Sequence, residues 1–236
     1  MIQKKKILAI IPARGKSKRI PKKNIRLLAG KPLITYTIET ALKSRYLNKI
    51  VVSTEDEEIA RISKKYGAEV TKRPKILAVD KAKTVEAVFH VLKVLTRKKY
   101  IPDLIILLQP TSPLRTVDDI DKAINIFLQN KCESVVSVCE MEPSPYRFFG
   151  IKEKYLKLIL GRKNLLKRSQ DLPKIYVING ALYISTPKII RKYKSFYSSK
   201  ILPYIMPKER SVDIDDEIEF KLAEIIIKNE RNKNRK

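Results

Sequence analysis

Short apolar runs alternate along this chain with segments of helical periodicity, and this alternation constrains the fold more than any other feature. The runs lie at residues 7–11, 50–53, 104–108 and 134–138. The run at 104–108 is unbroken Leu and Ile, which is typical of a central parallel strand covered by helices on both faces. Strands that alternate with helices in this order predict an α/β protein with a mostly parallel, right-handed, doubly wound sheet.

Apolar side chains at helical spacing predict the intervening helices, over residues 33–41, 54–66, 84–98 and 116–127. Pro32 suits the first position of a helix, and Gly67 can adopt the left-handed conformation that follows a last helical turn. Thr54 with Glu57 gives the pattern of a capping box, and Thr116 is expected to cap the helix that follows it.

The alternation breaks near residue 141 and resumes with a strand at 181–184 and a helix at 216–228. The intervening residues 142–176 are irregular, basic and partly apolar, which predicts an insertion that stands away from the main sheet. Its apolar side chains need a partner to cover them, and they include Phe148, Phe149, Leu156 and Leu165. A second copy of the chain is the simplest partner, so we expect a homodimer.

The net charge of +26, from 51 Lys and Arg against 25 Asp and Glu, predicts an affinity for anions. The excess is spread along the chain, and aromatic residues that could stack on bases are not interleaved with it. An anionic small-molecule substrate is therefore favoured over a nucleic-acid partner, which stays as a remote alternative. Cys132 and Cys139 are interpreted as reduced thiols, and no apolar run reaches the length of a membrane span. We expect a cytoplasmic protein.

A basic loop follows the first predicted strand, with the sequence Pro-Ala-Arg-Gly-Lys-Ser-Lys-Arg-Ile-Pro-Lys-Lys-Asn at residues 12–24. Gly15 is expected to expose backbone N–H groups, while Arg14, Lys18 and Lys23 supply positive charge. Together these groups predict a cradle for a polyphosphate. The spacings of the Walker loop and of the dinucleotide-binding glycine loop do not occur here, so neither of those sites is predicted.

A second loop offers polar groups at the same edge of the predicted sheet. Gln109, Thr111 and Ser112 follow the strand at 104–108 and supply an amide and two hydroxyls. Ligands of open parallel sheets bind outside the carboxyl ends of the strands, where loops distant in sequence converge. These residues therefore indicate part of a binding site, and the alternative is an ordinary turn bracketed by prolines.

Asp213 and Asp215 form the most informative pair of carboxylates in the chain. In extended backbone, residues two apart point to the same side, so both carboxylates would face one point while Ile214 faces the core. Two carboxylates at one point repel unless they share a cation, and Mg²⁺ is commonly held by one or two carboxylates plus substrate phosphates. The pair therefore predicts a Mg²⁺ site, with a cap of the following helix as the alternative.

Five ordered motifs, the first opening with Ile-Pro-Ala-Arg-Gly, give the chain a resemblance to the acylneuraminate cytidylyltransferases, or CMP-sialic acid synthetases. They lie at residues 11–24, 73–80, 107–115, 168–171 with 179–180, and 213–215, and the resemblance covers residues 5–227. It implies a Rossmann-like nucleotidyltransferase fold, a homodimer, and transfer of CMP from CTP to a nine-carbon α-keto sugar acid with release of pyrophosphate. We accordingly expect a nucleotide-binding catalytic domain at 1–141 and 177–228, a dimerisation and sugar-side insertion at 142–176, and a basic tail at 229–236.

The resemblance also implies roles for the matching residues. Nucleotide contacts would come from Arg14, Lys18, Asn24, Arg73, Thr111 and Ser112, and sugar contacts from Gln109, Arg147, Gln170 and Asn179. Lys23, Arg168 and Asp213 would take part in catalysis, and Asp213 with Asp215 would hold Mg²⁺. Lys16 and Arg19 stand where the family usually has glycine, and Val177 where several members have arginine. N-acylneuraminate is the expected acceptor, with legionaminate, pseudaminate and deoxyoctulosonate as alternatives.

Overall fold

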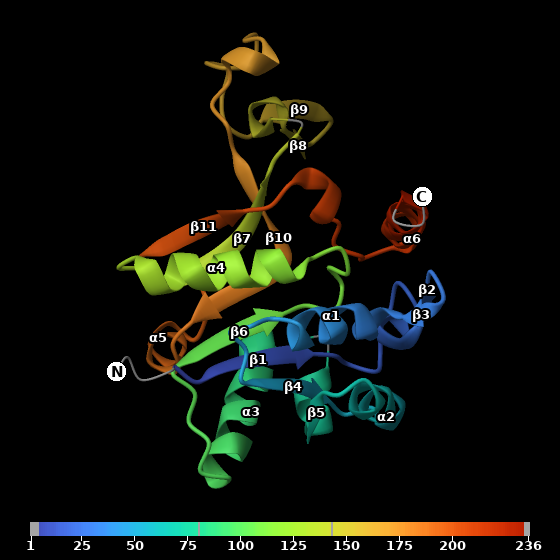
Figure 1. Ribbon diagram of the computed structural model, residues 1–236. Helices are drawn as coiled ribbons and strands as arrows, with labels where there is room; N and C mark the ends of the chain where they lie inside the picture. Colours follow the sequence, from blue (N-terminus) through green and yellow to red (C-terminus); the bar gives the residue numbers. More distant parts are fainter. Residues whose placement is uncertain (1–4, 80, 143, 234–236) are drawn as a thin grey trace.

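The structure of the protein, a computed structural model, describes residues 5–79, 81–142 and 144–233. Seven strands in these ranges form one sheet: β1 (Ile7–Pro12), β4 (Lys49–Thr54), β5 (Glu69–Lys72), β6 (Leu104–Leu108), β7 (Ser134–Glu140), β10 (Tyr176–Ser185) and β11 (Ile201–Ile205). Their spatial order is β11-β7-β10-β6-β1-β4-β5 (Figure 1). Neighbours pair in parallel, except that β10 is antiparallel to both β6 and β7. The predicted mostly parallel sheet is confirmed.

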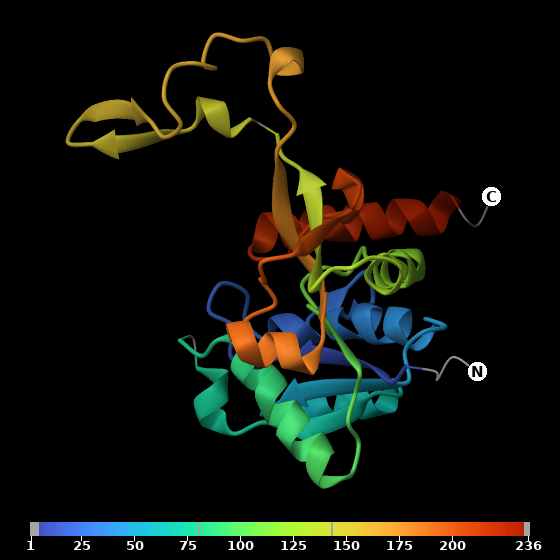
Figure 2. The same cartoon turned by 90° about the vertical axis from the view of Figure 1, so that its left-hand side faces the viewer.

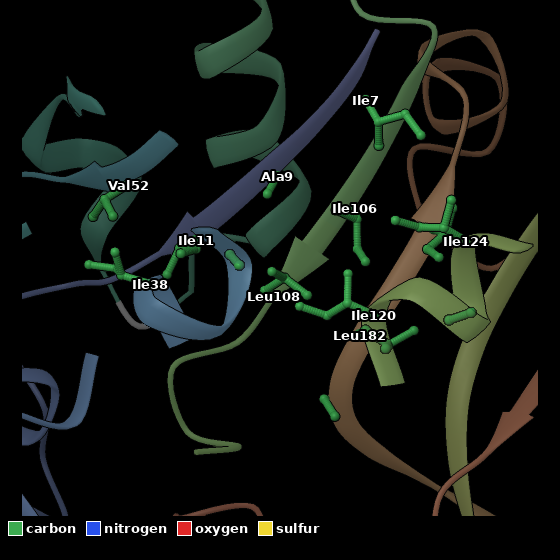
Figure 3. Close-up of a cluster of buried hydrophobic side chains, with 14 of the residues drawn as sticks. Ile7, Ala9, Ile11, Ile38, Val52, Ile106, Leu108, Ile120, Ile124 and Leu182 are labelled. Atoms are coloured by element: carbon green, nitrogen blue, oxygen red, sulfur yellow. The ribbon is translucent and has the colours of Figure 1, made fainter. Parts of the chain in front are cut away.

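Helices cover both faces of the sheet, as predicted for a doubly wound fold. One face carries α1 (Leu33–Leu42), α2 (Glu57–Lys65) and α4 (Val117–Gln129), and the other carries α3 (Thr84–Arg97) and α5 (Pro187–Tyr193). In β1, Ile7, Ala9 and Ile11 belong to the core under α1 and α4 (Figure 3). Leu8 and Ile10 point the other way, into the core under α3. This two-sided burial explains the unbroken apolar runs in the sequence.

The last helix, α6 (Glu217–Lys233), packs against the hairpin of β2 (Leu27–Leu28) and β3 (Lys31–Pro32). It continues past the predicted end at residue 228, because Arg231 donates to the carbonyl of Ala29 at 2.7 Å and to the hydroxyl of Tyr36 at 3.1 Å. Residues 229–233 belong to α6, which corrects the expected start of a basic tail at 229; residues 234–236 lie outside the described residues. None of the helices in the described residues combines the length and the hydropathy that a membrane-spanning helix needs.

The predicted insertion contains a small hairpin, β8 (Phe149–Lys152) and β9 (Tyr155–Leu158), that projects from the main body (Figure 2). We call residues 142–176 the arm. Ile151, Leu156 and Leu166 on the arm are exposed by 77%, 67% and 94%. The body of the same chain therefore leaves these side chains uncovered.

Three local predictions differ from the structure. Asp56, not Thr54, caps α2, because its carboxylate accepts the N–H of Ile59 at 2.9 Å, while Thr54 ends β4. Pro32 precedes the first turn of α1 as its N-cap and does not occupy the first helical position. The edge strand β5 was not predicted, since its short sequence Glu-Val-Thr-Lys carries little apolar signal.

Candidate active site

A cleft of about 540 Å³ lies at the carboxyl ends of β1, β5 and β6. This is the edge at which open parallel sheets bind ligands. Residues singled out from the sequence contribute much of its lining, namely Arg14, Lys18, Lys23, Asn24, Arg73, Gln109, Thr111 and Asp215. Three loops that are far apart in the chain therefore meet at one site.

The basic loop, which spans residues 13–24 because Pro12 still belongs to β1, is anchored by two hydrogen bonds. Asn24 is buried and donates its side-chain amide to the carbonyl of Arg14 at 2.9 Å. The N–H of Gly15 is donated to the Glu55 carboxylate at 2.7 Å. That N–H was expected to face a phosphate, so the structure corrects this detail.

Glycine is required at position 15 by close packing. A Cβ there would lie 2.5 Å from a carboxylate oxygen of Asp56. The unusual residues of the loop, Lys16 and Arg19, do not have positive φ; Lys22 does, at 52°. The loop thus accommodates both basic side chains without left-handed backbone at either position.

Arg73 lies almost buried in the wall of the cleft, with 7% of its surface exposed. Its Nη2 donates to the Glu55 carboxylate at 2.9 Å. Its Nε is buried and has no hydrogen-bond partner among the described residues. One end of the guanidinium is therefore fixed by protein while a further donor is still unsatisfied.

Residues 213–215, which we call the carboxylate segment, contact both the basic loop and the loop after β6. Lys23 donates to the carbonyl of Ile214 at 2.7 Å and to Asp215 at 3.2 Å, and Arg19 pairs with Asp215 at 3.1 Å. The N–H of Ile214 is donated to the carbonyl of Thr111 at 2.8 Å. The Ile214 side chain is fully buried, which confirms that it faces the core.

Asp213 is the less exposed of the two carboxylates. Burial raises the pKa of its carboxyl above the usual range, a hydrogen bond with Thr111 opposes this shift, and the Asp215 charge adds to it. Its Oδ1 is buried and has no partner among the described residues. A divalent cation would satisfy that oxygen and relieve the repulsion, so the two carboxylates fit a Mg²⁺ site. Among the described residues, no group of three or more His, Cys, Asp or Glu side chains is arranged so that it could hold a metal ion.

Two residues expected to contact substrates, Ser112 and Asn179, are buried and do not contribute to the cleft lining. Ser112 is fully buried, and its hydroxyl has no partner among the described residues. Asn179 is 4% exposed, donates to Ser211 at 2.9 Å, and accepts from the N–H of Ala181 at 3.2 Å. In this structure Asn179 therefore links the start of the buried part of β10 to Ser211.

The predicted sugar-side residues Arg147, Arg168 and Gln170 lie on the arm and are exposed. Arg147 donates to the carbonyl of Lys167, which belongs to the same arm, at 3.0 Å. These three residues do not contribute to the cleft lining. A single chain therefore does not bring them to the nucleotide side of the site.

Sequence reasoning missed two charged residues that organise the site. Glu55 bridges Gly15 of the basic loop and Arg73. Arg115 is almost completely buried, and burial lowers the pKa of its guanidinium to about 10. It donates to Thr37 at 2.9 Å and to the carbonyl of Ala181, which ties α1 and β10 to the loop after β6. The only signal was its place at the end of the 107–115 motif.

Comparison with known proteins identifies the family. The chain is 41% identical over 229 residues to the CMP-N,N'-diacetyllegionaminic acid synthase of Legionella pneumophila subsp. pneumophila, covering 93% of this chain and 95% of that protein. It is 37% identical to the N-acylneuraminate cytidylyltransferase of Escherichia coli O18:K1:H7, covering 97% of this chain and 53% of that protein. The sequence pattern of the family described as Cytidylyltransferase matches residues 8–231. The chain belongs to the acylneuraminate cytidylyltransferase family.

The fold of this cytidylyltransferase agrees with solved structures of more distant proteins. A structure of CMP:2-keto-3-deoxy-manno-octonic acid synthetase complexed with CTP matches with a TM-score of 0.72, covering 95% of this chain and 99% of that one. The sequence identity is 15%, so this likeness shows the fold alone.

Proposed function

We propose that this cytidylyltransferase activates a nonulosonic, sialic-type acid with CTP and Mg²⁺, giving the CMP-sugar and pyrophosphate. The observation that carries the proposal is the arrangement of the cleft. The basic loop meets the Asp213–Asp215 segment there through Lys23, whose ammonium lies 3.2 Å from Asp215. Positive charge for a triphosphate and one carboxylate, Asp215, thus line one cleft, and Asp213 adjoins it through a hydrogen bond with the lining residue Thr111.

The reaction needs positioning and charge stabilisation rather than a covalent protein intermediate. The anomeric hydroxyl oxygen of the sugar acid bonds to the α-phosphorus of CTP, the bond to the β-phosphate oxygen breaks, and pyrophosphate leaves. The hydroxyl proton passes to solvent. Arg14, Lys18 and Lys23 hold the triphosphate and offset the charge that grows on the leaving group. Asp213 and Asp215 would hold Mg²⁺, which would supply further neutralisation of charge at the phosphates.

We propose that the active unit is a homodimer in which the arm of one copy reaches the cleft of the other. This arrangement would cover the exposed Ile151 and Leu156. It would also bring Arg147, Arg168 and Gln170 to the sugar side of a cleft that they do not line in their own chain. Arg168 is the best candidate for the sugar carboxylate, because guanidinium groups bind carboxylates with two parallel hydrogen bonds.

The acceptor is a nonulosonic acid, and N-acylneuraminate is the first candidate. The similarity to the Legionella protein, 41% identical, favours a legionaminate-type acid as the second. A margin of four percentage points over the N-acylneuraminate enzyme, 41% against 37%, does not separate the two acceptors. Val177, which is half exposed at the base of the arm, is the departure that bears on this choice.

The test is pyrophosphate release from CTP and Mg²⁺ with N-acetylneuraminate as acceptor, and with ATP, GTP and UTP as controls. Release that requires both CTP and this acceptor supports the reaction and its sugar. Repeating the assay with legionaminate, pseudaminate and deoxyoctulosonate types ranks the alternatives. Release with another acid would replace the sugar but keep the reaction. If no acid gives pyrophosphate release and CTP does not raise the melting temperature, the proposal is rejected. The alternative would then be that the basic surface binds a nucleic acid.

A further inference from the structure

Glu55 occupies the junction between β4 and α2 and contacts two parts of the cleft at once. One carboxylate oxygen accepts the N–H of Gly15 at 2.7 Å, and the other accepts Nη2 of Arg73 at 2.9 Å. We propose that Glu55 is a positioning residue for nucleotide binding, which fixes the basic loop and the Arg73 guanidinium relative to each other. The proposal rests on the proposed function and adds a residue to that site.

The ion pair between Arg73 and Glu55 is buried, unlike the exposed ion pairs on the surface. The side chains of Arg73 and Glu55 are 6% and 13% exposed, whereas those of Lys72 and Glu57, which form a nearby pair, are 78% and 88% exposed. Exposed pairs contribute little, because water and salt screen them. Loss of one partner from a buried pair leaves an uncompensated charge in a poorly solvated place. The orientation of Arg73 therefore depends strongly on Glu55.

The chemistry of the contact requires a carboxylate. Two donors, a backbone N–H and a guanidinium N–H, point at one side chain, so that side chain must offer two acceptors. A glutamine has one acceptor and one NH₂ group, and the NH₂ would face one of the two donors. Replacement by glutamine keeps the size of the side chain and breaks one of the two contacts.

The free donor of Arg73 indicates what the orientation serves. Arg73 lines the cleft, and its buried Nε has no partner among the described residues. Buried donors without partners are rare in folded proteins. A ligand that reached this edge of the guanidinium from the cleft would satisfy such a donor, provided that the guanidinium is held in place. Glu55 holds it through Nη2, and the backbone N–H of Arg73 is also fixed, by donation to the carbonyl of Thr54 at 2.8 Å.

The same junction also seats the basic loop. A Cβ on Gly15 would collide with Asp56, which follows Glu55 and caps α2. The loop therefore rests directly on the start of α2, with Glu55 as its hydrogen-bond anchor. A shift of Glu55 would move the phosphate side and the Arg73 side of the cleft together.

The experiment compares Glu55→Gln with Glu57→Gln, a matched change at an exposed carboxylate in the first turn of α2. CTP affinity is measured by calorimetry in the presence of Mg²⁺, together with KM for CTP, KM for the sugar acid, and the melting temperature without ligand. We expect Glu55→Gln to weaken CTP binding about 10- to 100-fold, as for loss of one charge-assisted hydrogen bond. KM for the sugar acid should change less than about twofold, and Glu57→Gln should bind CTP like the wild type.

A second, milder variant tests the proposal if Glu55→Gln does not fold. Glu55→Asp keeps the charge but is one methylene shorter, so it can reach one donor and should weaken CTP binding by an intermediate factor. Adding Arg73→Ala to Glu55→Gln should cost less than the product of the two single effects, because part of the action of Glu55 passes through Arg73.

The outcomes separate this proposal from the proposed function. CTP binding that is equal in the wild type and in Glu55→Gln would overturn the positioning role alone. An equal loss for CTP and for the sugar acid would also overturn it, since that result indicates general damage. If the wild type itself does not bind CTP, the proposed function fails first.

Discussion

Lys23 joins the basic loop to the carboxylate segment, with its ammonium 2.7 Å from the carbonyl oxygen of Ile214 and 3.2 Å from the Asp215 carboxylate. Its side chain is 14% exposed, so these contacts are shielded from water. Asp215 also pairs with Arg19, but that pair is largely exposed. Lys23 is therefore the main link between the two charged walls of the cleft.

Replacing Lys23 by methionine should reduce turnover at least about 100-fold, because it removes a cation from the phosphate side and leaves Asp215 without its shielded partner. The matched control is Lys49→Met. Lys49 is 22% exposed and pairs with Glu69 at the start of β4, the end of that strand away from the cleft. Steady-state kinetics should show activity within about twofold of the wild type for the control. Equal losses in both variants would contradict the role of Lys23.

Asp213→Asn and Asp213→Ala should abolish Mg²⁺-dependent turnover while the fold is kept. The variants lose one of the two carboxylates that fit the cation, and Asp213 is the more buried of them. Circular dichroism should be unchanged, and Mg²⁺ with CTP should raise the melting temperature of the wild type only. Full activity of either variant with Mg²⁺ would contradict the assignment of Asp213 as a Mg²⁺ ligand.

The raised pKa of Asp213 gives a separate prediction for the ligand-free protein. Burial and the charge of Asp215 raise this pKa, so the folded state binds the proton more tightly than the unfolded state does. Ionised Asp213 therefore lowers stability at neutral pH, and this penalty disappears below the usual carboxyl range. We expect Asp213→Asn to melt at a higher temperature than the wild type near neutral pH, with a gap that closes below about pH 4. A difference in melting temperature that does not change with pH would contradict the raised pKa of Asp213.

The regular part of the fold could be predicted because its signals are local. The unbroken run of β6 and the helical spacing of α3 depend on burial of neighbouring residues, and both elements lie where the sequence places them. The capping role of Thr116 was also predictable, since its hydroxyl accepts the N–H of Asp119 three residues later. Strand direction is different. The sequence of β10 does not reveal that it runs antiparallel to β6, because an apolar strand reads the same in both directions.

The site could be predicted from the sequence only where the local pattern determines the direction in which a side chain points. Two-residue spacing placed Ile214 in the core, with the carboxylates on either side of it along the chain. Burial of Ser112 depends on packing between distant segments, and a hydroxyl between two prolines gives no sign of it. The contact of Glu55 with Gly15 joins residues 40 positions apart. Such contacts follow from the fold, so they could not be predicted from motif spacing.

The arm should mediate self-association through one face of its hairpin. Ile151 and Leu156 are cross-strand partners and are mostly exposed, so Ile151→Glu with Leu156→Glu should yield a monomer and reduce turnover. The control variant Lys152→Glu with Lys157→Glu also introduces two glutamates, but on the opposite face of the hairpin. It should leave the dimer intact. Size-exclusion chromatography with light scattering gives the mass. A wild type that is monomeric at micromolar concentration would contradict the proposed dimer.

Gly180→Ala should impair catalysis more than an equally strained glycine replacement elsewhere. Gly180 has φ +74°, and a Cβ there would lie 2.8 Å from a carboxylate oxygen of Asp213 and 3.2 Å from the amide oxygen of Gln109. Gly30, at φ +85°, has no such neighbour within 4 Å of the point that a Cβ would occupy. Gly30→Ala therefore meets backbone strain of about 1 kcal/mol and no collision.

We expect kcat/KM to fall at least about tenfold for Gly180→Ala and to change little for Gly30→Ala, because a shift of about 1 Å in a reacting group is costly. Steady-state kinetics of the two variants, with their melting temperatures, make the comparison. If the two variants lose activity equally, strain alone explains the effect, and the position of Asp213 against Gly180 is not important for turnover.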